Sequence, residues 1–269
     1  MKKLGIILVV LAFCPFQVHA KDGHKPVVKE NASASMAAGN IFKDCADCQE
    51  MVVIPPGSFE MGSNNGEDNE KPVHRVTIGK AFALGKTEVT QGQWKALMGD
   101  NPSKYINCGD NCPIEMVNWD DAQAFIRKLN EKTGKQYRLP SETEWEYACR
   151  AGGTHAYCGS DNMDSIGWYG GLAKPAGNSG KATNPVAGKQ PNAFGLYDMS
   201  GNVWEWVEDS YHENYNGAPT DGSTWQGDEA LRVPRGGSWS YLQRAAKRGG
   251  SQPKYRFGTI GFRLARTLP

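Results

Sequence analysis

Apolar and polar positions alternate with a helical period in three segments of the chain. In residues 118–134 the apolar side chains share one face, preceded by Asn118 or a neighbouring aspartate as a cap. Residues 90–99 and 141–153 each open with a hydroxyl residue, followed three positions later by Gln or Glu, and each ends at glycine. The pattern predicts three helices. The helix in residues 118–134 would bury one face, formed by Ala122, Phe125, Ile126 and Leu129. The other two would begin with the capping pairs Thr90 with Gln93 and Ser141 with Glu144.

Outside these segments the spacing favours strands and loops. The stretch EMVVIPPGSFEMGS, residues 50–63, has one short apolar run before Pro-Pro-Gly and another after it, which predicts a hairpin-like pair of strands. After residue 151, Gly, Asn, Pro, Trp and Tyr dominate and the helical period is lost. Because aromatic residues are rare in disordered segments, we expect long loops and short strands, pinned by a disulfide or a metal.

The first twenty residues have the organisation of a secretory signal peptide. Lys2 and Lys3 precede the apolar run LGIILVVLAF, and QVHA ends in a small residue, so cleavage is expected after Ala20. A membrane anchor is disfavoured because the run is too short for about 30 Å of hydrocarbon. Lipid attachment at Cys14 is disfavoured because Phe13 stands where a small residue is needed. The short leader suits a bacterium, which predicts a periplasmic or secreted protein.

The rest of the chain divides into a short segment and one domain. Residues 21–43 are small and polar with little periodicity, which predicts a flexible segment, and residues 44–269 remain for the domain. With Lys+Arg 30 against Asp+Glu 29, no global charge attracts nucleic acid or an anionic membrane. The sequence contains no second long apolar run, so it predicts no membrane span after the leader. The phosphate-binding loop, the nucleophile elbow and the zinc-protease motif are missing from the sequence.

Cysteine spacing predicts local disulfides. Six cysteines follow the leader in three close pairs: Cys45 with Cys48, Cys108 with Cys112, and Cys149 with Cys158. The first four could together ligate zinc, but an even number of cysteines in an exported chain favours disulfides. This pairing would leave no free thiol for catalysis.

Seven blocks of sequence then occur in a recognisable order. They are MVVIPPGSFEMGS, HRVTIGKAFALGKTEVTQGQW, PIEMVNWDDAQAFIRKLN, RLPSETEWEYACRAG, GLYDMSGNVWEW, RVPRGGSW and IGFRLAR. In this order, from Met51 to Arg266, they resemble the formylglycine-generating enzyme family, also called sulfatase-modifying factor. The resemblance implies an α+β fold: a single, irregular mixed α/β domain, C-type-lectin-like, with little regular secondary structure.

The same resemblance raises a question about chemistry. The family's activity is copper- and oxygen-dependent oxidation of a sulfatase cysteine to formylglycine, and it depends on two cysteines that follow the GGS-aromatic block. Here that segment, residues 236–266, contains no cysteine. Because copper(I) is held by soft thiolates, we expect the fold to be kept but not copper or the oxidase reaction.

A calcium ion is the cofactor that the resemblance implies. The family holds one structural calcium in the GLYDMSGNVWEW loop, and the matching positions are the Asp198 and Glu205 side chains and the carbonyls of Met199, Gly201 and Val203. Calcium takes six to eight oxygen ligands, so backbone carbonyls suit it. The alternative is that Asp198 caps a helix starting near Asn202 while Glu205 faces solvent. A second calcium site of the family is not expected.

The segment after GGSW is the candidate ligand groove. By resemblance, the groove floor would carry Ser238, Trp239, Tyr241, Arg244 and Arg248. Arginine suits carboxylate or phosphate recognition, and the aromatic rings offer stacking surface. The alternative is that Trp239 belongs to the core and the arginines are structural ion-pair partners. His212 lies in a polar loop and receives no role.

Three functions remain open from the sequence. The first is an exported ligand-binding or accessory domain without copper-dependent cysteine oxidation, taking a small-molecule or peptide ligand. The second is a periplasmic oxidative tailoring enzyme on the same fold, of the siderophore-maturation type. The third is a true formylglycine-generating oxidase acting on sulfatases, which the missing cysteine pair disfavours.

Overall fold

Helix α2, Trp119–Thr133, forms where the helical period is clearest. The structure is a computed structural model that describes residue 1 and residues 37–227, 230–241 and 243–269. The Asn118 side chain accepts from the Asp121 amide and the Asp121 side chain accepts from the Asn118 amide, which is a complete capping box. Gly134, with a φ of 66°, ends the helix. The predicted face is buried: Ala122, Phe125, Ile126 and Leu129.

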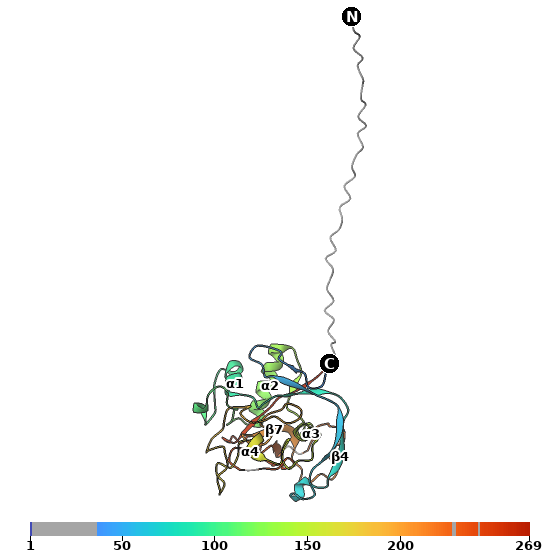
Figure 1. The fold of residues 1–269 in the computed structure, drawn as a ribbon, viewed down its shortest axis with the longest axis vertical. Coiled ribbons are helices and arrows are strands. Elements are labelled where there is room, and N and C mark those ends of the chain that lie inside the picture. Colours follow the sequence, from blue (N-terminus) through green and yellow to red (C-terminus); the bar gives the residue numbers. More distant parts are fainter. Residues whose placement is uncertain (2–36, 228–229, 242) are drawn as a thin grey trace. The chain divides into compact units, whose positions relative to one another are not determined.

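The other two predicted helices are also confirmed. Helices α1, Gln91–Met98, and α3, Glu142–Arg150, both begin with the predicted capping boxes. Figure 1 shows α1 beside α2, and the rings of Trp94 and Phe125 stack between them at 5.4 Å. Helix α3 ends at Ala151, with a φ of 47°, one residue before the predicted glycine pair.

A fourth helix and two 3₁₀ turns were not predicted. Helix α4, Met163–Ile166, has four residues, which is too short for a helical period to be recognised. The 3₁₀ turns η1, Asp68–Glu70, and η2, Ile106–Cys108, lie in loops.

The predicted hairpin is wrong. Strands β2, Met51–Ile54, and β3, Gly57–Met61, form as expected, but they join different sheets. Strand β3 pairs instead with β4, His74–Ile78. All four residues of β2 are buried because the strand lies between two others, whereas exposed residues of β3 alternate with partly or fully buried ones.

The largest sheet has five strands and brings distant segments together. In order across the sheet, they are β1 (Ile41–Phe42), β2, β5 (Phe82–Gly85), β10 (Ala265–Thr267) and β6 (Tyr137–Arg138). Neighbouring strands are antiparallel. Because β1 pairs with β2, the ordered fold begins before the predicted boundary at residue 44. The predicted signal peptide beyond Met1, and residues 21–36, lie outside the described residues.

A three-stranded sheet carries the loop that was predicted to bind calcium. Strand β7, Trp204–Ser210, lies between antiparallel β8, Arg232–Arg235, and parallel β9, Ile260–Phe262. Figure 1 shows β7 beside α3, with which it is in contact. Helix makes up 18% and strand 20% of the residues that the structure describes, so irregular structure predominates among them and the predicted fold class is confirmed.

The cysteine pairing is confirmed as well. Disulfides join Cys45 to Cys48, Cys108 to Cys112, and Cys149 to Cys158, so the zinc alternative is wrong. Cys149 and Cys158 are buried in the core between α3 and the sheets. Among the residues that the structure describes, no helix combines the length and the apolar character needed to cross a membrane.

Candidate functional site

The loop before β7 turns tightly around Asp198. Asp198, Gly201 and Asn202 all adopt left-handed backbone angles, with φ values of 56°, 88° and 57°. The chain then continues directly into β7, so the alternative of a helix starting near Asn202 is wrong. Asp198 Oδ2 accepts from the Ala187 amide at 2.7 Å, while Oδ1 is buried and has no hydrogen-bond partner among the described residues.

Glu205 is buried and both its oxygens are occupied. Arg263 donates to Oε1 and to Oε2, each at 2.6 Å, and the Trp145 indole donates to Oε2 at 2.7 Å. The alternative of a solvent-facing Glu205 is therefore wrong. Asp198 Oδ1 is free to accept a cation, whereas Glu205 is held by an arginine.

A third carboxylate, Glu88, joins this cluster and was missed from the sequence. It accepts from the Val203 amide at 3.0 Å and from the Asn202 side chain at 2.9 Å. Burial, reinforced by the Asp198 and Glu205 charges, raises the pKa of Glu88 well above its usual value. Glu88 is more than a hundred residues away in sequence, and no local pattern links it to this loop.

The buried cluster carries more negative than positive charge. Burial raises the pKa of Asp198 to about 6, although the Ala187 amide and Arg263 oppose the shift. Three carboxylates face a single guanidinium, so a divalent cation beside Asp198 would offset the excess charge. Among the described residues, no three His, Cys, Asp or Glu side chains form a metal-binding group on their own. A calcium ion here would therefore depend on the carbonyls of the loop.

The five predicted groove residues do not share one surface. Ser238 is buried, and its hydroxyl is 2.7 Å from the Ser240 hydroxyl. Arg248 is only 1% exposed and binds Glu142 at 2.6 and 2.8 Å, which is the structural role that the alternative described. In this structure neither Ser238 nor Arg248 is accessible to a ligand, and we correct both assignments.

The other three predicted residues differ in exposure: Tyr241 is exposed, Arg244 is partly exposed and Trp239 is buried. Tyr241 is 52% exposed. Arg244 is partly exposed, but its guanidinium binds both oxygens of buried Glu70 at 2.7 and 2.9 Å. Trp239 is 6% exposed, and its indole donates to the Gly258 carbonyl at 2.8 Å. Its ring meets Tyr105 edge-on at 5.5 Å.

Four loops converge on Trp239. The Gly171 amide donates to the Trp239 carbonyl at 2.8 Å, and the Leu172 amide donates to the Ser240 carbonyl at 3.0 Å. Tyr105 and Gly258 contact the indole from the other loops. These four loops carry the following exposed apolar side chains, which we call the Trp239 face: Ile106, Leu172, Tyr241, Tyr255 and Phe257.

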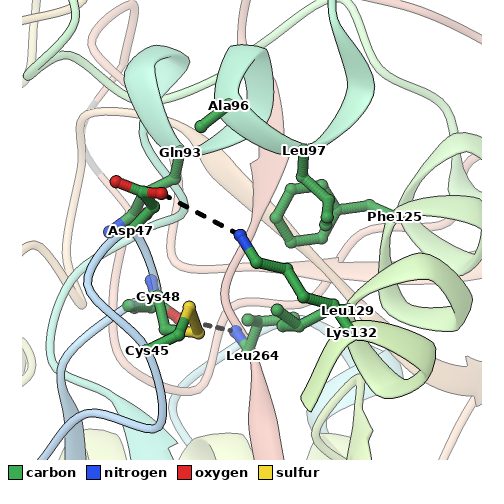
Figure 2. Close-up of a pocket in the computed structure, with 11 residues that line it drawn as sticks. Cys45, Asp47, Cys48, Gln93, Ala96, Leu97, Phe125, Leu129, Lys132 and Leu264 are labelled. Carbon is green, nitrogen blue, oxygen red and sulfur yellow. Dashed lines mark hydrogen bonds and ion pairs between the residues drawn. A yellow bond between two sulfur atoms is a disulfide. The ribbon is translucent and has the colours of Figure 1, made fainter.

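Two hollows lie elsewhere. Figure 2 shows a cavity beside the Cys45–Cys48 disulfide, crossed by the ion pair of Asp47 and Lys132; its volume is about 10 Å³, which is room for one water at most. An open depression of about 470 Å³ is lined by the loop after β7 and by Trp225. His212 stacks on Trp225 there at 3.7 Å. None of the five predicted groove residues lines either hollow.

Fold and sequence together define the class of protein. Residues 37–268 match the family of sulfatase-modifying factor enzyme 1-like domains. The chain therefore belongs to this family, as the ordered blocks of sequence predict.

The relatives of this chain carry different protein names. The formylglycine-generating enzyme of Streptomyces coelicolor is 29% identical over 80% of this chain and 88% of its own length. The chaperone protein LppX of Paenibacillus barcinonensis is 29% identical over 77% of this chain and 85% of its own. Among solved structures, PvdO from Pseudomonas aeruginosa superposes with a TM-score of 0.76 at 35% identity, covering 86% of this chain and 99% of PvdO.

Proposed function

We propose that this protein is an exported member of the family that binds a small-molecule or peptide ligand at the Trp239 face and does not oxidise cysteine with copper. The observation that carries the proposal is the state of the cysteines. Residues 236–266 contain none, and the six cysteines after the leader are all joined in disulfides. No thiolate is left to bind copper(I).

The ligand-binding part of the proposal is supported by exposed apolar surface. Large apolar side chains grouped on a few loops commonly mark a binding site, whereas isolated ones do not. Tyr241 and Phe257 are 52% and 44% exposed, and both lie on loops that are fixed by hydrogen bonds around Trp239. The face is thus largely preformed, which lowers the entropic cost of binding.

The test of the chemistry is co-expression with a sulfatase substrate, with and without added copper. We expect no aldehyde above the empty-vector background. Copper-dependent aldehyde would contradict the proposal, because oxidation would then proceed without the cysteine pair. A formylglycine-generating enzyme expressed in parallel is the positive control.

The test of the ligand face uses 2-phenylethanol as a small aromatic probe in saturation-transfer NMR. We expect transfer to the probe from wild-type protein and its loss in a Tyr241→Ser, Phe257→Ser double variant. Tyr197→Ser, a substitution outside the face, is the control and should leave transfer unchanged. Equal transfer in all three proteins would contradict binding at this face.

A periplasmic oxidative tailoring enzyme, of the siderophore-maturation type, is the second candidate. It is favoured by the similarity to PvdO, which covers 99% of that chain and so includes the whole domain. Turnover that depends on a redox-active metal, without aldehyde formation on a sulfatase, would support this candidate over the first.

The proposal includes the periplasm as destination and calcium as a structural ion beside Asp198. The destination is supported by the leader sequence and by three disulfides, which persist in oxidising compartments. The calcium ion is supported by the unpaired Asp198 oxygen and by the excess negative charge around it.

A further inference from the structure

Glu115 is a buried acid with one oxygen left unpaired. Its Oε1 accepts from the Tyr105 amide at 2.7 Å, while Oε2 is buried and has no hydrogen-bond partner among the described residues. Burial raises the pKa of this carboxyl, and the amides of Tyr105 and Lys104 oppose the shift. An unpaired buried carboxylate oxygen is costly, so a donor supplied by a ligand would be stabilising.

The unpaired oxygen lies close to the Trp239 face. A Cβ added at Gly258 would lie 3.4 Å from Glu115 Oε2 and 3.1 Å from the Tyr105 ring. The Gly258 carbonyl itself accepts from the Trp239 indole at 2.8 Å. Glu115 Oε2 therefore lies close to Gly258, the residue whose carbonyl binds the Trp239 indole.

The backbone holds Glu115 in place under strain. Met116 has a φ of 59°, a left-handed angle that a residue with a side chain rarely adopts. Its amide donates to the Phe257 carbonyl at 3.0 Å, which fixes the loop that carries exposed Phe257. Such strain persists where the surrounding structure requires it, and it is often found at binding sites.

An exposed lysine already places a cation at this position. Lys104 Nζ lies 5.4 Å from the centre of the Tyr105 ring. A Cβ at Gly258 would be 3.2 Å from its Cδ and 3.4 Å from Glu115 Oε2, so the stem of Lys104 and this carboxylate lie beside the same glycine. An ammonium group over an aromatic ring and near a carboxylate is favourable, and here the chain supplies its own.

We propose that the Trp239 face binds an arylalkylammonium group, whose ring contacts the exposed aromatic side chains and whose N–H donates to Glu115 Oε2 when Lys104 moves aside. This inference rests on the proposed ligand-binding function. A neutral aromatic ligand would leave Oε2 unpaired, and an anionic one would be repelled by Glu115. The face therefore selects for a positive charge next to an aromatic ring.

The experiment compares three probes of similar shape by calorimetry: phenethylamine, 2-phenylethanol and 3-phenylpropionate. We expect wild-type protein to bind phenethylamine at least tenfold more tightly than the other two. Glu115→Gln should remove this preference, and Lys104→Met should strengthen phenethylamine binding several-fold. Because Lys104 is exposed, the second variant is informative even if Glu115→Gln fails to fold, which thermal melting would reveal.

The outcomes separate this inference from the proposed function. If 2-phenylethanol binds and phenethylamine is not preferred, the ammonium inference is overturned while the ligand face stands. If phenethylamine is preferred equally in wild type and a folded Glu115→Gln variant, the role of Glu115 is overturned. If none of the probes binds wild type or Lys104→Met, both the inference and the proposed aromatic ligand face are overturned.

Discussion

Fully buried arginines are each held by glutamate in this molecule. Arg248 binds Glu142, and Arg263 binds Glu205. Arg248 also donates to the carbonyls of Asn69 and His212, so it joins three separate segments. Such a pair adds little stability relative to an apolar core, but removing one partner leaves a buried charge uncompensated.

Replacing Arg248 by methionine should therefore be strongly destabilising. We expect Arg248→Met to lower the free energy of unfolding by about 3–5 kcal/mol, measured in urea, because buried Glu142 loses both bonds from Arg248 and, among the described residues, keeps only the longer contact with Arg235 at 3.3 Å and the Tyr215 hydroxyl at 3.2 Å. Arg256→Met is the matched control: its pair with Asp121 is 47% and 27% exposed, so a loss of about 1 kcal/mol or less is expected. Similar losses in the two variants would contradict the structural role of Arg248.

Asp209 should make stability depend on pH. Burial, with a further contribution from the Glu142 charge, raises the pKa of Asp209 to about 8, although the Trp225 and Glu142 amides and Arg248 oppose the shift. Between about pH 4 and 8 the folded state keeps a proton that the unfolded state has lost, so the free energy of unfolding falls as pH rises through this window.

The measurement is the difference in unfolding free energy between wild type and Asp209→Asn at pH 5 and pH 8. The variant does not titrate there, so it should gain stability relative to wild type at the higher pH. Asparagine has one hydrogen-bond acceptor fewer than aspartate, which adds the same offset to the difference in unfolding free energy at both pH values. A difference that does not change with pH would show that Asp209 is ionised throughout. Asp120→Asn, at an exposed position, is the control.

At the scale of elements, the end of α3 is tied to the following loop by a disulfide. Cys149 and Cys158 are both buried in the core and lie nine residues apart. Cys45 and Cys48, only three residues apart, close a smaller loop, and Cys45 is partly exposed. A longer loop gives a larger loss of entropy in the unfolded chain.

Removing the Cys149–Cys158 bridge should thus cost more than removing Cys45–Cys48. We expect the Cys149→Ala, Cys158→Ala variant to lose up to about 3 kcal/mol, and the Cys45→Ala, Cys48→Ala variant to lose about 0.8 kcal/mol less by loop closure alone. Chemical unfolding of both variants measures this. Equal stability of the three proteins would mean that the bridges do not constrain the unfolded chain, and peptide mapping without reduction checks the pairing itself.

At the scale of the whole molecule, the irregular half of the chain should depend on calcium. If the ion binds beside Asp198, occupancy at a hundred times its dissociation constant adds about 2.7 kcal/mol to folding stability. Chelator should therefore lower the melting temperature, and added calcium should restore it. In Asp198→Ala the chelator should have little effect. Unchanged melting, together with purified protein that contains no calcium, would rule the ion out.

The sequence by itself determined the features that depend on near neighbours. The caps of α1, α2 and α3 use residues three positions apart, and the disulfides join cysteines at most nine apart. The family, and with it the fold class, followed from blocks of sequence in a fixed order. Each of these signals is local or is conveyed by resemblance, so no tertiary contact was needed to recognise it.

Only the tertiary structure decided which distant residues meet. It placed β2 and β3 in different sheets, although their sequence suggested a hairpin. It buried Arg248 and Ser238, which had been assigned to the groove, and it added Glu88 to the Asp198 loop. It also brought Glu115 close to Trp239. Burial and pairing between segments far apart in the chain depend on the packing of the whole domain, and the local pattern of apolar and polar positions does not specify that packing.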